Sequence, residues 1–144
     1  KAQTVDAVKL LQFNLLMDYT ERVALARLPL GTSKEIFSAV QYIRNRTNAQ
    51  IGIDDVAAAM GKSRSYITKQ FRHETGKSIT EFITESKLQD AKRLLRYSDK
   101  SLAEIANYLC FSSQAYFQTV FKNETGMTPG EYRKRHETSS SGTR

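Results

Sequence analysis

Apolar residues recur at helical spacing through the second half of the chain. Three of them fall on one helix face between residues 102 and 109: Ile105, Ala106 and Leu109. Ser101 and Glu104 stand at the spacing of a capping box, which predicts that this helix begins at residue 102. The pattern breaks at residues 110–111, where we expect a turn.

A second helical pattern follows this turn and extends to residue 123. Either Ser112 or Ser113 can cap its first turn through the side-chain hydroxyl. Its apolar positions predict an inward face of Tyr116, Phe117, Val120 and Phe121. The other positions predict an outer face of Gln114, Ala115, Gln118 and Thr119. Two short helices joined by a tight turn, the second with a polar outer face, are typical of a helix-turn-helix, here at residues 102–123.

Another helix is expected after this motif. Gly126 favours a helix end, and Thr128 offers a cap for the next helix. Pro129 suits a first helical position, and Glu131 completes the cap. The whole segment therefore predicts an all-α fold.

The pattern occurs a second time upstream, in residues 53–82. Equivalent residues are Ile53 and Leu102, Ala57 and Ala106, Met60 and Leu109, Ser63 and Ser112, Phe71 and Phe121, Ser78 and Thr128, and Phe82 and Tyr132. Both copies contain Glu-Thr-Gly, and one extra residue enters the second copy just after the paired serines. This repeat predicts two small lobes, with a first helix-turn-helix at residues 53–74 and Gly61 in its turn.

A long helix is expected to join the lobes. Ser78 and Glu81 can cap it, and it continues to about residue 97. The residues expected to face inward are Phe82, Ile83, Leu88, Ala91, Leu94 and Leu95. The basic residues expected outside are Lys87, Lys92, Arg93 and Arg96. A continuous helix at about residues 79–97 would fix the separation of the lobes better than a loop.

The remaining segments flank these repeats. Thr32 and Glu35 offer a capping box for a helix to about Arg46, with the expected core residues Ile36, Ala39, Val40 and Ile43. Residues 1–31 carry two adjoining apolar stripes at helical spacing, which can pack against this chain, against a preceding domain, or against a second copy. The domain proper is expected at residues 32–136, and the polar stretch 137–144 is expected to be disordered.

Composition favours a folded domain with an anionic partner. The 144 residues carry a net charge of +7 and include 7 Tyr and 7 Phe, which argues against a disordered chain. With a pI near 9.6, nucleic acid is the commonest partner for such a helical domain, and an anionic membrane surface is the alternative. The sequence holds no run of roughly 20 apolar residues that could span a bilayer.

Other chemistry has little support in the sequence. A single cysteine cannot form an internal disulfide, and with no visible signal peptide it predicts a reducing, cytoplasmic location. His73 and His136 have no companions at metal-ligand spacing, so no metal or other cofactor is expected. Because no phosphate loop or nucleophile motif occurs, we do not predict an enzyme.

The second helix of the first repeat carries the first set of candidate DNA contacts. Ser63 caps the helix, and the outer face consists of Arg64, Ser65, Thr68 and Lys69, flanked by Lys62 and Arg72. Arg64 and Lys69 can donate to guanine O6 and N7, or can serve as phosphate contacts. The residues expected in the core are Tyr66, Ile67 and Phe71.

The second repeat carries a chemically different set. Its candidates are Ser112, Gln114, Ala115, Gln118, Thr119 and Lys122. Glutamine can bond adenine in bidentate fashion, and the methyl groups of Ala115 and Thr119 suit thymine. We therefore predict G-containing contacts for the first lobe and contacts richer in A·T for the second. The aromatic residues here are expected in the core, not as a stacking platform for single strands.

These motifs resemble the AraC/XylS family of bacterial transcription regulators over roughly residues 34–135. The positions that carry the resemblance are Phe111, Tyr116, Phe117, Phe121, Lys122, Gly126, Pro129, Tyr132 and Arg133. Cys110 departs from the pattern, since the family usually has glycine in this turn, and Lys87 replaces an arginine usual in the linker helix. A non-glycine residue with positive φ in this turn would cost about 1 kcal/mol.

The resemblance implies sequence-specific binding of double-stranded DNA by a cytoplasmic, nucleoid-associated regulator, usually an activator that contacts RNA polymerase. Its two recognition helices would enter successive major grooves about 34 Å apart. A separate ligand-sensing or dimerising domain is common in such regulators, so residues 1–31 could connect to one or support a homodimer. A helical protein-interaction module and the DNA-targeting part of a larger nucleic-acid enzyme are the alternatives.

Overall fold

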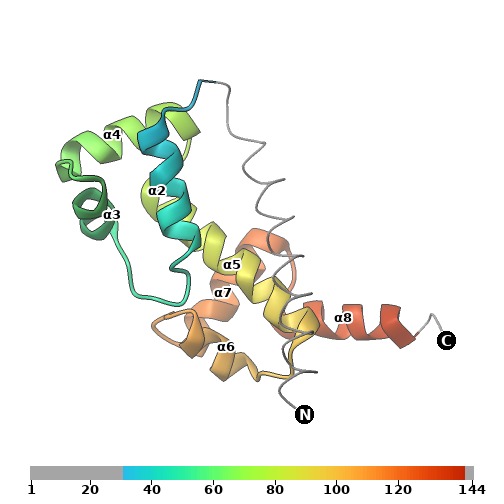
Figure 1. Cartoon of the computed structure of the whole chain (residues 1–144). Coiled ribbons are helices and arrows are strands. Elements are labelled where there is room, and N and C mark those ends of the chain that lie inside the picture. Colours follow the sequence, from blue (N-terminus) through green and yellow to red (C-terminus); the bar gives the residue numbers. More distant parts are fainter. Residues whose placement is uncertain (1–30, 142–144) are drawn as a thin grey trace, which may run out of the picture. The chain divides into compact units, whose positions relative to one another are not determined.

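The computed structural model describes residues 31–141, with side chains to residue 137, and every regular element in this part of the chain is a helix (Figure 1). The helices are α2 (Lys34–Arg44), α3 (Ile53–Met60), α4 (Arg64–Thr75), α5 (Ile79–Tyr97), α6 (Leu102–Tyr108), α7 (Gln114–Thr125) and α8 (Pro129–Ser141). This confirms the all-α prediction. Apart from Gly31, the predicted N-terminal helical segment lies outside the described residues.

Helix α5 belongs to two lobes. Its N-terminal half packs with α2 and α4, and its C-terminal half packs with α8 and contributes to a core shared with α6 and α7 (Figure 1). We call α2, α3, α4 and the N-terminal half of α5 the first lobe, and the remainder of α5 with α6, α7 and α8 the second lobe. The linker helix and the two lobes are where the repeat pattern predicts them.

The two cores repeat the same aromatic arrangement. Phe71 meets Phe82 edge-on, with ring centroids 5.5 Å apart and planes at 75°. In the second lobe Phe121 meets Tyr132 at 5.5 Å and 76°. Phe71 and Phe121 are fully buried, and burial of such a ring contributes roughly 1.5–3 kcal/mol to the stability of the fold. The sequence repeat is therefore a repeat of packing.

The cap of α2 differs from the prediction. Ser33, not Thr32, is the N-cap, and its Oγ accepts the Ile36 N–H at 3.2 Å. The backbone N–H of Ser33 donates to the Glu74 carboxylate of α4 at 2.6 Å. A carboxylate from another helix thus completes this cap, whereas the sequence predicts Glu35 in that role.

The extra residue of the second repeat also lies elsewhere than predicted. Ser113 caps α7 by accepting the Tyr116 N–H at 3.0 Å, as Ser63 caps α4. The preceding turns each place one residue in the left-handed region, Gly61 with φ 67° and Cys110 with φ 60°. With these turns and caps aligned, the inserted residue is Ser112, which lies before the cap.

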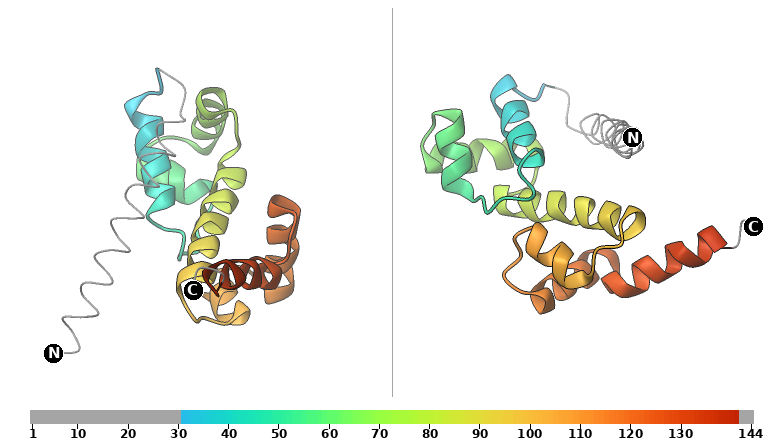
Figure 2. Two further views of the ribbon diagram at one scale, coloured as in Figure 1. Left: turned by 90° about the vertical axis from the view of Figure 1, so that its right-hand side faces the viewer. Right: turned by 60° about the horizontal axis from the view of Figure 1, so that its bottom comes forward.

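Two predictions about the helix surfaces and ends need correction. Lys87, expected outside α5, is only 7% exposed. Helix α8 runs to Ser141, into the stretch for which the sequence predicts disorder, and Figure 2 shows its C-terminal end projecting away from the other helices of the second lobe. Near its start, Arg133 donates from Nε to the Leu95 carbonyl at 3.0 Å and so satisfies a carbonyl at the end of α5. Within the described residues, no helix is long and apolar enough to cross a membrane.

Candidate nucleic-acid interface

Helices α4 and α7 are built alike and are presented alike. Each has 12 residues, a serine N-cap, and a glycine in the left-handed conformation at its C-terminal end. Each is fixed to its lobe by two fully buried anchors four residues apart, which are Ile67 and Phe71 in α4, and Phe117 and Phe121 in α7. Anchors at this spacing occupy one narrow stripe, so the opposite face of each helix is left outside.

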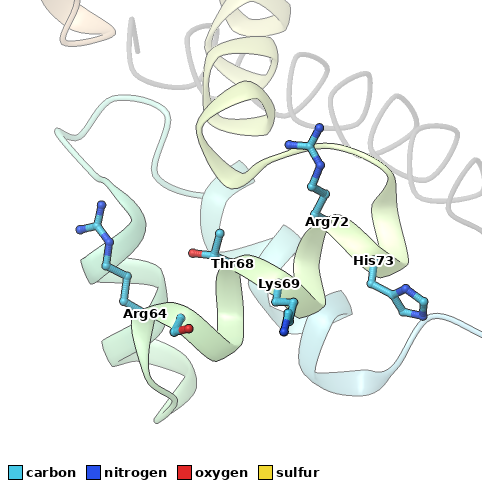
Figure 3. A pocket seen from close by; sticks show the side chains of 6 residues that line it. Arg64, Thr68, Lys69, Arg72 and His73 are labelled. Atoms are coloured by element: carbon cyan, nitrogen blue, oxygen red, sulfur yellow. The ribbon is translucent and has the colours of Figure 1, made fainter.

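The outer face of α4 brings together the first set of predicted contacts. An open pocket on this face is lined by Arg64, Ser65, Thr68, Lys69, Arg72 and His73. Figure 3 shows the labelled side chains following one another along the helix, from Arg64 near its start to His73 near its end. Thr68 is half-buried, whereas the other predicted contacts are exposed. Ser63 is the N-cap, as predicted.

The charges on this face favour an anionic ligand. Arg64 forms an exposed ion pair with Asp54, with Nη1 and Oδ1 3.0 Å apart. Such a pair is worth at most about 1 kcal/mol, so the guanidinium can exchange Asp54 for a phosphate. Among the described residues, no carboxylate lies within ion-pair distance of Lys69 or Arg72. The N-terminus of α4 adds a partial positive charge at its Ser63 end.

The outer face of α7 is nearly neutral. Gln114, Ala115, Thr119 and Lys122 are exposed, Gln118 is half-buried, and Ser112 is exposed just before the cap. The Thr119 hydroxyl donates to the Ala115 carbonyl at 3.0 Å. The hydroxyl proton is thus used within the helix, and the oxygen lone pairs and the methyl group are what Thr119 can offer to a ligand. The face suits hydrogen bonding and methyl contacts better than charge neutralisation.

Two tyrosines that the sequence assigns to the core are exposed. Tyr66 is 45% exposed and Tyr116 is 53% exposed. Each directly precedes a buried anchor, and one residue along an α-helix is a rotation of about 100°, which turns the ring out of the core. The Lys62 ammonium lies 5.3 Å from the centre of the Tyr66 ring, and Tyr116 packs against Phe111.

Sequence reasoning could have identified this pair. With the serine caps Ser63 and Ser113 aligned, Tyr66 and Tyr116 occupy the same position of the repeat. Their phenol groups lie in the first turn of each helix, beside the predicted contacts. They therefore join those residues as candidates to contact a ligand.

Several acidic side chains near the interface serve as caps. Asp55 accepts the Gly52 N–H at 2.8 Å, which places its carboxylate at the start of α3. In the described part of the chain, no three His, Cys, Asp or Glu side chains gather where they could hold a metal ion. The side chains left to contact a ligand on the outer faces of α4 and α7 are therefore mainly cations, amides and hydroxyls.

Comparisons with known proteins place this geometry among DNA-binding domains. The family profile described as a helix-turn-helix domain matches residues 56–135. An uncharacterized HTH-type transcriptional regulator from the cgkA 5′ region of Pseudoalteromonas carrageenovora is 40% identical over 97 residues, which are 67% of this chain and 57% of that protein. The xylose operon regulatory protein of Escherichia coli K12 is 38% identical over 102 residues, which are 71% of this chain and 26% of that protein.

A solved structure extends the comparison to a complex with DNA. The DNA-binding domain of AdpA, described as a global transcriptional factor and crystallised with a target DNA, superposes with a TM-score of 0.70. It is 25% identical, and the match covers 74% of this chain and 96% of that domain. The chain thus covers nearly all of a DNA-binding domain, but 57% and 26% of the two full-length relatives.

Proposed function

We propose that this chain binds duplex DNA sequence-specifically through α4 and α7, because it belongs to the AraC/XylS family of helix-turn-helix DNA-binding domains. That family consists of transcription regulators and not of enzymes. The observation that carries the proposal is the duplicate construction of the two helices, each capped by serine, anchored by two buried side chains and polar outside. A duplex presents the same groove once per turn, about 34 Å apart, and two similar helices suit two such grooves.

The two helices would contribute different interactions. On α4, Arg72 would neutralise phosphates, Lys69 would contact phosphate or guanine, and Arg64 would do the same after leaving Asp54. On α7, Gln114 and Gln118 would bond base edges, and the methyl groups of Ala115 and Thr119 would contact thymine. The remaining predicted contacts would form hydrogen bonds with the DNA backbone or with neighbouring bases. They are Ser63, Ser65, Thr68, Ser112 and Lys122. The first lobe would then supply most of the electrostatic affinity.

At the level of the whole protein, we propose a cytoplasmic transcription regulator at the bacterial nucleoid. It would act as an activator through contacts with RNA polymerase, and residues 1–31 or a further domain would make it a homodimer. These roles draw on the family and on the share of longer relatives that this chain spans.

Selection of sites from a random duplex library, followed by hydroxyl-radical footprinting and a salt titration, tests the proposal. We expect enriched sequences with two protected stretches one helical turn apart on one face of the duplex. The logarithm of the binding constant should fall linearly with the logarithm of the salt concentration, by roughly 0.9 per phosphate contact. The double variant Lys69→Ala/Arg72→Ala should lower this slope by about 2. If no DNA sequence is enriched and the association that is measured does not depend on salt, the result would instead support the alternative that this chain is a helical protein-interaction module.

A further inference from the structure

The two lobes meet at one buried ammonium group. Lys87 extends from the middle of α5, and its Nζ lies 2.7 Å from the Thr47 carbonyl and 2.9 Å from the Ala49 carbonyl of the first lobe. The same Nζ lies 2.6 Å from the Leu109 carbonyl of the second lobe. We call Lys87 and its acceptor residues Thr47, Ala49 and Leu109 the lobe junction.

The hydrogen bonding of this ammonium is complete. A protonated lysine has three N–H donors, and the lobe junction supplies three carbonyl acceptors. A neutral amine would have two donors and would leave one buried carbonyl unbonded. Burial lowers the pKa of Lys87 below its usual 10.5, and the neighbouring Cys110 and Asp90 oppose this shift. Asp90 also accepts a hydrogen bond from the Thr47 hydroxyl, which holds that side of the junction against α5.

A weaker contact lies beside the ammonium. Cys110 follows Leu109 in the turn between α6 and α7, and its Sγ lies 3.5 Å from the Asn48 carbonyl. Asn48 stands between the two first-lobe acceptors, Thr47 and Ala49. The turn of the second helix-turn-helix and the loop before the first therefore abut directly.

Both contact points lead directly to the proposed reading helices. The loop with Thr47 and Ala49 continues into α3, which packs against α4. The turn at Leu109 continues into α7 through its cap Ser113. A change at the lobe junction would thus rotate one reading helix relative to the other, without any change on either outer face.

We propose that Lys87 is a positioning residue that sets which spacing between two DNA half-sites the domain accepts. This inference rests on the proposed binding of two successive grooves. One added base pair rotates the second half-site by about 35° and moves it by about 3.4 Å. A domain with a fixed junction cannot follow that movement, whereas a domain with a loosened junction can.

The test measures binding to duplexes whose half-sites, defined by footprinting of the parent chain, are separated by the selected spacing or by one base pair more or less. We expect the parent to lose about tenfold in affinity at either altered spacing, the size of effect of a mismatched base pair. Lys87→Met keeps the aliphatic length and removes the donors, and its affinities at the three spacings should differ by less than about threefold. Lys87→Arg, which keeps donors, should retain the optimum of the parent.

A matched control separates positioning from stability. Ile43→Val destabilises the first lobe by removing one methyl group from its core and leaves the lobe junction intact. It should bind with the spacing preference of the parent. If Lys87→Met also keeps that preference, the positioning role is wrong; if the parent itself has no second half-site, it is the proposed function that fails.

A second measurement does not require DNA and covers a variant that folds poorly. Residual dipolar couplings from the two lobes of the parent should fit one alignment tensor. In Lys87→Gln, which has two donors and a shorter reach, the lobes should require separate tensors while each lobe keeps its own fold. One common tensor for Lys87→Gln would overturn the inference.

Discussion

The side chains on the outer faces of α4 and α7 differ in charge. Helix α4 presents Arg64, Lys69 and Arg72, whereas α7 presents Lys122 as its cation among amides, an alanine and a threonine. Phosphate contacts make affinity depend on salt, and base contacts make it depend on sequence. Substitution of an uncharged residue on α7 should therefore change base preference alone, whereas substitution of a cation on α4 should also change the salt dependence of binding.

We expect Lys69→Ala to reduce the salt slope by about 1 and to relax base preference at its position in the first half-site. Gln118→Ala should cost about 1–3 kcal/mol against the selected base in the second half-site, with the salt slope unchanged. Competition titrations against a panel of single-base variants of the selected site, each at two salt concentrations, measure both quantities.

Lys34→Ala is the control for net charge, because Lys34 is exposed at the start of α2, outside both outer faces. It should leave base preference unchanged. If Lys69→Ala and Gln118→Ala both discriminate among the panel as the parent does, the outer faces are not the reading surfaces.

The turn residue Cys110 carries backbone strain that can be measured. Its φ of 60° costs an L-residue roughly 1 kcal/mol, and glycine avoids that cost but gives up conformational entropy of about 0.4–1 kcal/mol on folding. We expect Cys110→Gly to raise the free energy of unfolding by at most about 0.6 kcal/mol in urea denaturation. Gly61→Ala, at the equivalent turn with φ 67°, reverses both effects and should lower it by at most about 0.6 kcal/mol. A loss of stability in Cys110→Gly would show that the contact with Asn48 outweighs the strain.

Some residue environments could not be predicted from local pattern. The sequence predicts Lys87 outside because a lysine is rarely buried, but its three acceptors lie 40, 38 and 22 residues away in the sequence. The sequence predicts Tyr66 inside because it is aromatic and falls at helical spacing with the core residues. Both errors come from the use of residue type where distant contacts or helix rotation decide.

The helices themselves follow local signals closely. Helix α5 begins after its predicted cap Ser78, and α6 after Ser101, because the cap hydroxyl and the backbone N–H that donates to it are only three residues apart. Helix α2 is the exception, since its cap is completed by Glu74, 41 residues away. The Glu74 carboxylate accepts from the backbone and hydroxyl of Ser33 and from Gln70, and so ties α2 to α4.

This tie should make the first lobe sensitive to acid. Burial raises the pKa of Glu74, but the hydrogen bonds from Ser33 and Gln70 outweigh that effect and hold the pKa below its usual 4.5. The unfolded chain therefore binds the proton more tightly than the folded one. The stabilisation is fully present above pH 4.5 and is lost as the pH falls through the lower folded value. We expect Glu74→Gln to cost about 1–2 kcal/mol at pH 7 and progressively less in acid, as measured by urea unfolding across pH.

Glu124 occupies the position of Glu74 in the second repeat and is exposed, so Glu124→Gln is the matched control. Its effect at pH 7 should stay within about 0.5 kcal/mol. A constant difference between the parent and Glu74→Gln from pH 7 to pH 3 would mean that the carboxylate charge does not support the cap.

In the whole molecule, the repeat predicts two lobes and a connecting helix, but their mutual orientation is a tertiary property. It depends on the lobe junction, where carbonyls from both lobes meet one side chain of α5. Apolar periodicity carries no information about such contacts, because it reports which face of each helix is buried and not how one lobe turns against the other. The outer faces of α4 and α7 were thus predictable from the sequence, while the orientation of one face relative to the other was not.

The length of α5 sets a limit that DNA of altered length can test. Its 19 residues span about 28 Å, so the lobes cannot separate by a further helical turn of DNA, about 34 Å. We expect insertion of 5 or of 10 base pairs between the half-sites to reduce affinity to that of a single half-site in fluorescence anisotropy titrations. If the connection between the lobes were flexible, affinity would instead recover with an insertion of 10 base pairs, because the two half-sites would again lie on one face of the duplex. The same insertions placed outside the two half-sites control for DNA length and should leave binding unchanged. Recovery at 10 base pairs with the chain bound as a monomer would show that α5 does not hold the lobes at a fixed distance.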